Sequence, residues 1–458
     1  MGEGRELGPR TERIELGPPA RRFALLIAGA VLTACVGAWV SAGPPASRIG
    51  PHLSVHGLAF AAYLGALVVS RGLSRRALLA ALGAALAWRI VLVTAPPLLS
   101  DDINRYVWEG RIQLHGGNPY RWSDRPTAAR WEPLRDEVWE GLNHPHYTAV
   151  YPPLFQLAVR AVVGVHDSIT AMKAFLVACE LATLGLLALV LRRRGLGLER
   201  LLVLAWSPLA LFEIAGSGHN EAFAILWLVL ALLALDRGWP LASALAASAG
   251  FMAKFLPGLV AAAWARRYRP LHVLAAAALA GALAWPYLDA KRTMLTSLSK
   301  YAQFWRFNET LFAPLAALLG SHEAAVRAGA LATLALALVL AARRVEPARA
   351  ALAVVAASLL LSPNVLPWYG LWLLPLLVVR DAPGALLFTG TVPLAYLAYP
   401  DWQSGEPWHL GWGWRALEYG PPVLVALRHR LDRHGDRAAP RSDSTAASSD
   451  SSPGVHPG

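Results

Sequence analysis

Two adjacent carboxylates, Asp101 and Asp102, follow directly after a long apolar segment that covers residues 77–97. A bilayer crossing takes about 20 apolar residues, so this segment can span a membrane and leave the pair where the helix meets water. A carboxylate held at a membrane surface can act as a general base that removes a proton from a hydroxyl group. The alternative is a solvated helix cap, in which the same side chains only stabilise a helix end.

The residues after the pair predict a short helix that carries further polar groups. Ser100 is a suitable N-cap residue, and both aspartates would then lie in the first turn, where the helix dipole favours anions. Asp102, Arg105, Tyr106 and Glu109 follow the i, i+3, i+4, i+7 spacing, so they share one face of this helix. Arg105 is therefore either part of a surface ion pair or a residue that holds Asp102 or a phosphate.

The chain as a whole has the composition of a membrane protein. Of its 458 residues, 55% are hydrophobic and 16% are charged, compared with about 25% charged residues in an average soluble domain. The net charge of +12 comes from basic residues at the ends of apolar blocks, which is the positive-inside pattern and not a nucleic-acid-binding groove. Cys35 and Cys179 both lie inside apolar blocks and form no metal or redox motif.

The apolar blocks predict an all-α, polytopic transmembrane helical bundle with helices in its extracytoplasmic loops. They allow about 12 crossings plus one re-entrant hairpin at residues 239–265, with both termini in the cytoplasm. The first outer loop covers residues 98–169, and its short apolar part, 151–163, is expected to be interfacial or re-entrant. The chain thus divides into a disordered N-terminus (1–22), a transmembrane domain (23–430) and a disordered tail (431–458).

Three further polar clusters are expected on the outer face together with the aspartates. His219 can bind a phosphate, orient the base or cap its helix, and Glu221 can be a dipole-stabilised carboxylate without a further role. The convergence of these clusters predicts a site that opens outward. The clusters are His219, Asn220 and Glu221; residues 300–308 with Lys300 and Arg306; and Asn364, Trp368 and Tyr369.

Ionisable residues also occur inside the apolar blocks. Each costs about 2.5–3.5 kcal/mol at the bilayer centre, so these side chains should face the bundle interior or extend to the surface. Arg89 either meets an anionic group that enters from the lipid or pairs with Glu180 or Glu213. Lys254, at the break of the hairpin, either approaches a phosphate or extends to the cytoplasmic face.

Six short motifs resemble those of the polyprenol-phosphate-mannose-dependent mannosyltransferases of the GT-C superfamily, over about residues 20–430. The resemblance implies an inverting hexosyltransferase in the plasma membrane that moves mannose from a polyprenyl-phosphate donor. The acceptor would be a glycan or glycolipid on the extracytoplasmic face. The motifs are Ser100–Arg111, Gly117–Tyr120, Tyr151–Pro153, Gly218–Glu221, Lys254–Pro257 and Ser362–Tyr369.

The resemblance also implies roles for individual residues. The family's base maps to Asp101 or Asp102, and Glu221 stands where relatives often have aspartate. One base suffices for a single inverting displacement, and a departing lipid phosphate needs neighbouring cations. The candidate cations are Arg105, His219, Lys254, Lys300 and Arg306, and the other candidate substrate-binding residues are Tyr106, Asn220, Glu221, Trp368 and Tyr369. We expect no metal, cofactor or nucleic acid, and the alternatives are a transporter or lipid flippase and a glycan polymerase or ligase.

Overall fold

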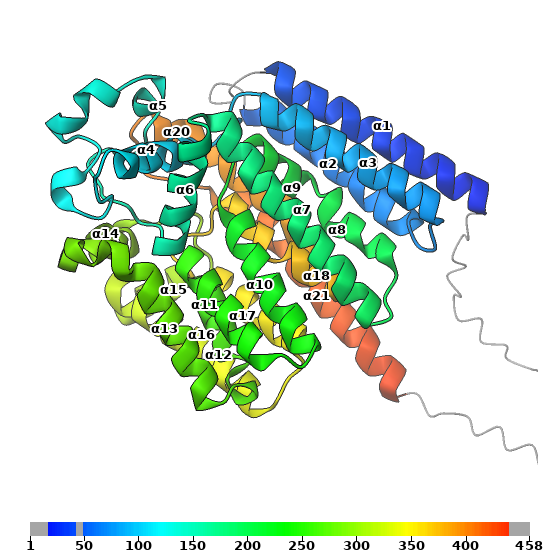
Figure 1. Ribbon diagram of the computed structural model, residues 1–458. Coiled ribbons are helices and arrows are strands. Elements are labelled where there is room, and N and C mark those ends of the chain that lie inside the picture. The colour runs from blue at the N-terminus through cyan, green and yellow to red at the C-terminus, as the bar shows by residue number, and fades with distance from the viewer. Residues whose placement is uncertain (1–16, 43–48, 439–458) are drawn as a thin grey trace, which may run out of the picture.

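The structure, a computed structural model, describes residues 17–42 and 49–438, and in these ranges the protein is helical without a β-strand. Three long helices, α1 (Pro18–Ala42), α2 (Ile49–Val69) and α3 (Arg75–Thr94), pack side by side along one edge of the molecule (Figure 1). All three are rich in Ala, Leu and Val, and the Ser74 side chain caps α3 by accepting from the N–H of Ala77. The predicted helices in this region are therefore confirmed.

The first predicted loop folds into a helical cap over the end of the bundle, cyan in Figure 1. The cap consists of α4 (Asp102–Leu114), η2 (Trp122–Asp124), η3 (Ala129–Leu134), α5 (Glu137–Glu140) and α6 (Pro153–Val165). The predicted N-cap of α4 was wrong by one residue. Asp101 occupies the cap position and α4 begins at Asp102, while the Ser100 hydroxyl accepts from the N–H of Asp102 at 3.3 Å.

The centre of the bundle contains a broken helix. After α7 (Ile169–Arg193) come η4 (Leu198–Leu201), α8 (Leu202–Ala205), α9 (Pro208–Ala210) and η5 (Leu211–Gly216), a π-helical segment. The chain then bends by 120° into α10 (Glu221–Asp236). The crossing predicted at 199–216 is thus not one continuous helix, because Pro208 starts a new helix and cannot continue the preceding one.

The predicted hairpin at 239–265 is present as two short helices, α11 (Pro240–Ala253) and α12 (Leu256–Ala262), separated at Lys254. The remaining chain completes the bundle and the cavity described below. Its elements are η6 (Ala265–Arg267), α13 (Pro270–Ala284), η7 (Trp285–Leu295), α14 (Thr296–Phe304), α15 (Phe312–Leu319), α16 (His322–Ala342), α17 (Pro347–Leu361), η8 (Pro367–Trp372), α18 (Leu374–Val379), α19 (Pro383–Thr391), η9 (Val392–Ala398), α20 (Tyr399–Gln403) and α21 (Trp412–Ala438).

Length and composition qualify six described helices as membrane spans, or seven if the bent pair counts as one span. This is fewer than the predicted count of about 12, because proline and glycine divide several of the later apolar blocks into shorter helices. The predicted domain limits also differ from the helix ends. Helix α1 begins at Pro18 and α21 continues to Ala438, whereas residues 1–16 and 439–458 of the expected disordered ends lie outside the described residues.

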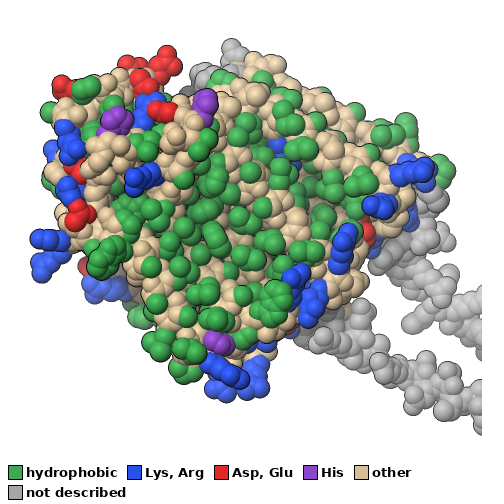
Figure 2. All heavy atoms as spheres, viewed as in Figure 1, with side chains coloured by type: hydrophobic (Ala, Val, Ile, Leu, Met, Phe, Trp, Pro, Cys, Tyr) green, Lys and Arg blue, Asp and Glu red, His purple; other side chains and the backbone are tan. Residues whose placement is uncertain are grey.

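The surface of the bundle is suited to a lipid environment. Figure 2 shows apolar side chains over the middle of the visible face, with Lys and Arg gathered toward its margins. On α13, Leu271 and Leu274 are 70% and 66% exposed. Such exposure of large apolar side chains is costly in water and favourable against lipid chains.

An ion pair inside the bundle connects α3 to α7. The Arg89 guanidinium donates to both Glu180 oxygens, at 2.8 and 2.5 Å, and to the carbonyl oxygens of Ala85 and Ala205. Arg89 is fully buried and Glu180 is 2% exposed. The prediction that Arg89 pairs with Glu180 is therefore confirmed, and its guanidinium is already engaged by protein groups, which argues against the alternative of an anion from the lipid.

Candidate active site

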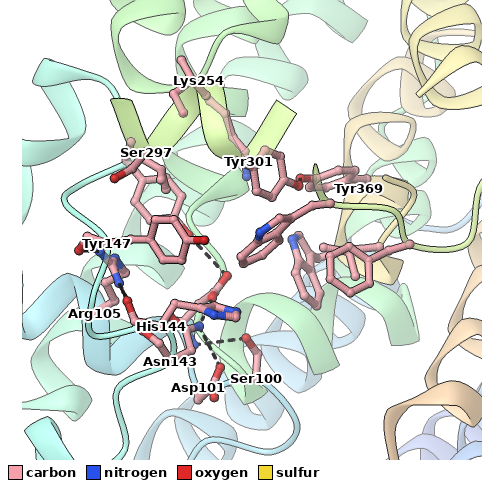
Figure 3. Close-up of a pocket in the computed structure, with 18 of the residues that line it drawn as sticks. Ser100, Asp101, Arg105, Asn143, His144, Tyr147, Lys254, Ser297, Tyr301 and Tyr369 are labelled. Carbon is pink, nitrogen blue, oxygen red and sulfur yellow. Dashed lines mark hydrogen bonds between the residues drawn. The ribbon is translucent and has the colours of Figure 1, made fainter. Parts of the chain in front are cut away.

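A cavity of about 240 Å³ lies where the cap meets the broken helices. Its walls come from the start of α4, the loop that leads to α6, the break between α11 and α12, α14 and the segment from η8 to α20 (Figure 3). Side chains from distant parts of the sequence therefore face one space. The predicted site residues that line it are Asp101, Asp102, Arg105, Lys254, Trp368 and Tyr369.

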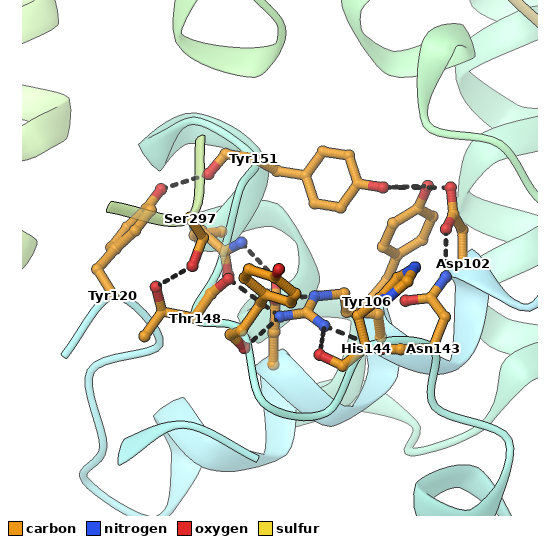
Figure 4. Close-up of polar contacts among 12 residues, drawn as sticks. Asp102, Tyr106, Tyr120, Asn143, His144, Thr148, Tyr151 and Ser297 are labelled. Atoms are coloured by element: carbon orange, nitrogen blue, oxygen red, sulfur yellow. Dashed lines mark hydrogen bonds and ion pairs between the residues drawn. The ribbon is translucent and has the colours of Figure 1, made fainter. Parts of the chain in front are cut away.

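The two aspartates share one hydrogen-bond donor. The side-chain amide of Asn143 donates to Asp101 Oδ1 at 2.9 Å and to Asp102 Oδ1 at 2.6 Å. The second oxygen of Asp102 accepts from the hydroxyl of Tyr151 at 3.3 Å (Figure 4). Both oxygens of Asp102 are thus held in place, which fixes the direction in which this carboxylate can accept a proton.

The environment of Asp101 favours its neutral form. Burial by the surrounding protein, followed by the charge of Asp102, raises the pKa of Asp101 to about 6, against the opposing effects of Asn143 and Arg105. Asp101 nevertheless keeps exposed surface and lines the cavity. Asp101 therefore changes its charge close to the pH at which an enzyme works.

Arg105 holds the loop that carries Asn143. Its Nε donates to Glu109 Oε1 at 2.9 Å, and its two terminal nitrogens donate to four carbonyl oxygens within residues 143–148, at 2.6–3.2 Å. The side chain is 4% exposed, so the predicted surface ion pair is instead a buried one. Sequence reasoning missed Asn143, because no local motif marks a loop residue that only the folded cap brings to the aspartates.

Lys254 faces the same cavity from the end opposite Asp101 (Figure 3). Its ammonium group pairs with Glu221 and donates to Asn220 Oδ1 at 3.0 Å, and it lies 5.3 Å from the centre of the Tyr369 ring. Lys254 thus lines the cavity and is held there by two buried side chains. Asn220 and Glu221 lie behind Lys254 and position its cation.

His219 lies beside Asp102 and does not line the cavity. Its Nδ1 is 3.9 Å from Asp102 Oδ2, and its ring stacks on Trp368 with centroids 3.9 Å apart and an interplanar angle of 18°. Tyr106 is also buried, with its hydroxyl 3.4 Å from that of Tyr151. Both residues lie behind the aspartate end of the cavity and do not line it.

The structure places Lys300 and Arg306 outside the cavity lining. The Lys300 ammonium lies 5.5 Å from the centres of the Trp122 and Tyr147 rings, and Arg306 pairs with Glu309. The neighbouring residue on α14, Tyr301, reaches the cavity instead and shares a 2.8 Å hydrogen bond with the Tyr369 hydroxyl.

Aromatic residues form one wall of the cavity, and none of them was named as a site residue, although Trp305 and Phe307 lie in the predicted cluster at 300–308. Trp305 and Trp402 each lie against both Phe307 and His144, with ring centroids 4.4–6.2 Å apart. The density of aromatic residues between 301 and 307 and between 399 and 408 was the available signal. The cavity-lining aromatics of this wall are Trp305, Phe307, Tyr399, Trp402 and Trp408.

Comparison with known proteins gives one result. No curated protein and no solved structure matches this chain. A family model described as "Alpha-(1->6)-mannopyranosyltransferase, N-terminal domain" matches residues 20–268, more than half of the 458-residue chain. The match includes both aspartates, His219 and Lys254, so the resemblance to membrane mannosyltransferases is confirmed, and the chain belongs to the alpha-(1->6)-mannopyranosyltransferase family.

Proposed function

We propose that the protein transfers mannose from a polyprenyl-phosphate donor to a hydroxyl group of a glycan or glycolipid, with inversion at the anomeric carbon. Family membership supports the mannosyl transfer itself. The observation that carries the proposal is the placement of Asp101 and Lys254 at opposite ends of one cavity that Asp102 also lines. An inverting displacement needs this arrangement, because the attacking and leaving oxygens lie on opposite sides of the anomeric carbon.

Asp102 acts as the base in this proposal. The acceptor hydroxyl gives its proton to the Asp102 carboxylate as its oxygen forms the bond to the anomeric carbon. The bond from that carbon to the phosphate oxygen breaks, and the lipid phosphate keeps the electron pair and leaves as an anion beside Lys254. Because the family description specifies an alpha linkage, inversion requires a beta-linked donor.

The other residues have supporting roles. Arg105 and Tyr106 position the aspartate end, and Asn220 and Glu221 position Lys254, as the contacts above support. Trp368 and Tyr369 contact the substrates, since aromatic faces suit the apolar faces of sugar rings.

The distribution of basic residues supports the sidedness that belongs to this proposal. The positive-inside pattern favours a cap on the extracytoplasmic side of the plasma membrane, with both termini in the cytoplasm.

The proposal is tested with purified protein in lipid nanodiscs. Incubation with labelled mannosyl-phosphoryl-polyprenol and a mannoside acceptor should yield an alpha-linked product and free polyprenyl phosphate in equal amounts. A sugar-nucleotide donor serves as the control and should give no product. Absence of transfer from the lipid donor, or transfer from the nucleotide donor alone, contradicts the proposal.

The rate of transfer should depend on the ionisation of Asp101. The pKa of Asp101, raised to about 6, makes this carboxyl neutral below that pH and anionic above it. The anion makes its neighbour Asp102 a better proton acceptor, so kcat/KM should be constant above pH 7 and fall as the pH decreases through about 6. The Asp101→Asn variant should be slower but lack this decrease near pH 6, and an unchanged profile would contradict the assignment.

Removal of the Lys254 cation should slow the release of the phosphate. Lys254→Met should lower kcat by about 100-fold, since electrostatic stabilisers of a leaving group contribute on this scale. Lys254→Arg keeps the charge and should retain more activity. The exposed Lys291 offers the control, and Lys291→Met should leave kcat unchanged. Equal rates for Lys254→Met and the wild-type protein would exclude Lys254 from the reaction.

A further inference from the structure

A buried polar chain continues inward from Asp102 and has no place in the transfer steps given above. His219 Nε2 lies 3.3 Å from Glu213 Oε2, on the side of the ring opposite Asp102. The hydroxyl of Tyr396 donates to both Glu213 oxygens, at 2.9 and 3.1 Å. All three side chains are nearly inaccessible, with exposures of 0% for Glu213, 1% for His219 and 2% for Tyr396.

The local backbone has an unusual form that brings Glu213 and His219 together. Residues Leu211–Gly216 form a π-helix, a rare conformation that occurs often at functional sites. The N–H of His219 donates to the carbonyl oxygen of Glu213 at 2.9 Å. Between them, Gly218 adopts φ +82°, where a side chain would be strained and would collide with Ile103. The backbone therefore turns tightly enough between Glu213 and His219 for their side chains to lie next to each other.

The burial of Glu213 calls for a partner. A carboxylate in an apolar interior is costly unless it is paired or shares a proton. Neither ring nitrogen of His219 has a regular hydrogen bond to another described residue, although one faces Glu213 and the other Asp102. The stack against Trp368 keeps the His219 ring in this orientation. If the ring nitrogens moved closer to Asp102 and Glu213, both contacts would become hydrogen bonds.

We propose that Glu213 is a positioning residue that, with Tyr396, orients His219 so that an Nδ1–H points at the Asp102 carboxylate. This inference rests on the proposed function, in which Asp102 is the base. The Glu213–His219 unit holds two protons. They are either one on Glu213 and one on Nδ1, or both on the imidazole ring next to anionic Glu213. In both distributions Nδ1 keeps its proton and donates toward Asp102, while Glu213 fixes Nε2 from behind.

Other ionisable groups surround Glu213 and His219 and affect their protonation. Lys254 is the nearby cation, and its charge disfavours a proton on the imidazole, whereas the carboxylates favour one. The ring N–H of His219 would hold the Asp102 carboxylate in its orientation, so its loss should lower kcat. The groups that face the chain from the elements packed around it are Asp102, Tyr106, Tyr151, Glu221, Lys254 and Tyr396.

The test compares variants that remove or keep the hydrogen bond to Nε2. Glu213→Leu should lower kcat by about 10- to 100-fold, the range for lost partners of a functional histidine, with KM within about threefold of the wild-type value. The acid limb of kcat/KM, which the Asp101 carboxyl sets, should keep its midpoint near pH 6. Glu213→Gln should recover most of the rate, because its amide can donate to Nε2 as protonated Glu213 does.

A second comparison separates positioning from a structural role. If Glu213 acts only through His219, the double variant Glu213→Leu/His219→Phe should be no slower than the slower single variant. A structural role would instead make the two losses additive. Glu418 is another fully buried carboxylate, bonded to Asn308. Glu418→Leu is the matched control, and its kcat and pH profile should stay unchanged per folded protein.

The outcomes separate the inference from the proposed function. Wild-type protein without transfer activity contradicts the proposed function. Active wild-type protein with a Glu213→Leu variant of normal kcat, or with additive losses in the double variant, overturns the inference alone. If Glu213→Leu does not fold, Tyr396→Phe decides the question, with Tyr63→Phe as its control, since the buried Tyr63 hydroxyl donates to the carbonyl of Val203. A wild-type kcat in Tyr396→Phe then overturns the inference.

Discussion

Replacement of Asp102 by asparagine should lower the rate of mannosyl transfer by about 10²- to 10⁴-fold, the usual contribution of a general base. The amide oxygen can still accept from Asn143 or Tyr151, but it cannot take the proton of the acceptor hydroxyl. Geometry is retained and chemistry is lost, so kcat should fall while KM for the donor changes little. Steady-state kinetics with the lipid donor measure both constants.

Two comparisons make this result specific to Asp102. Asp101→Asn should cost about tenfold, because it removes only a neighbouring charge. Asp167 belongs to the same loop and pairs with Arg111 away from the cavity. Asp167→Asn should therefore keep the wild-type rate. A larger loss in Asp101→Asn than in Asp102→Asn would transfer the role of base to Asp101.

Removal of one partner of the Arg89–Glu180 pair should have the largest effect on stability. Arg89→Met leaves an unpaired carboxylate inside the bundle and should lower the free energy of unfolding by about 3–5 kcal/mol. Glu180→Met leaves an unpaired guanidinium and should cost a similar amount. The double variant removes both charges and should recover most of the loss. Thermal unfolding in detergent gives the comparison.

An exposed pair provides the reference for this measurement. Glu323 and Arg327 pair on α16 at exposures of 58% and 72%. Such surface pairs contribute less than about 1 kcal/mol, so Arg327→Met should unfold close to the wild-type temperature. If Arg89→Met also unfolds there, water reaches the buried pair and the destabilisation argument does not hold.

The sequence predicted those features that depend on residues close together in the chain. The apolar blocks predicted the helical bundle, and the position of Asp101 and Asp102 after such a block predicted their place at a membrane boundary. Lys254 stood out as a charge at a proline-linked break, and the structure places it in the cavity. In each case the residues of one short segment are sufficient to predict the feature.

The remaining features depend on contacts between distant segments. Asn143 reaches the aspartates only because Arg105 binds the carbonyl groups of its loop, and no periodicity encodes that contact. His219 is stacked on Trp368, about 150 residues later. Hydropathy also cannot register where a proline or a π-helical turn divides an apolar block into shorter helices, as at Pro208 and Leu211–Gly216.

The stack of His219 on Trp368 also has a consequence for the order in which the site is synthesised. The region that the family model covers ends at residue 268, so it supplies the aspartates and the lysine but not Trp368, Tyr369 or Tyr396. During synthesis the two aspartates therefore leave the ribosome before the aromatic side chains that line the same cavity. The cavity wall is complete only when the last third of the polypeptide has been made.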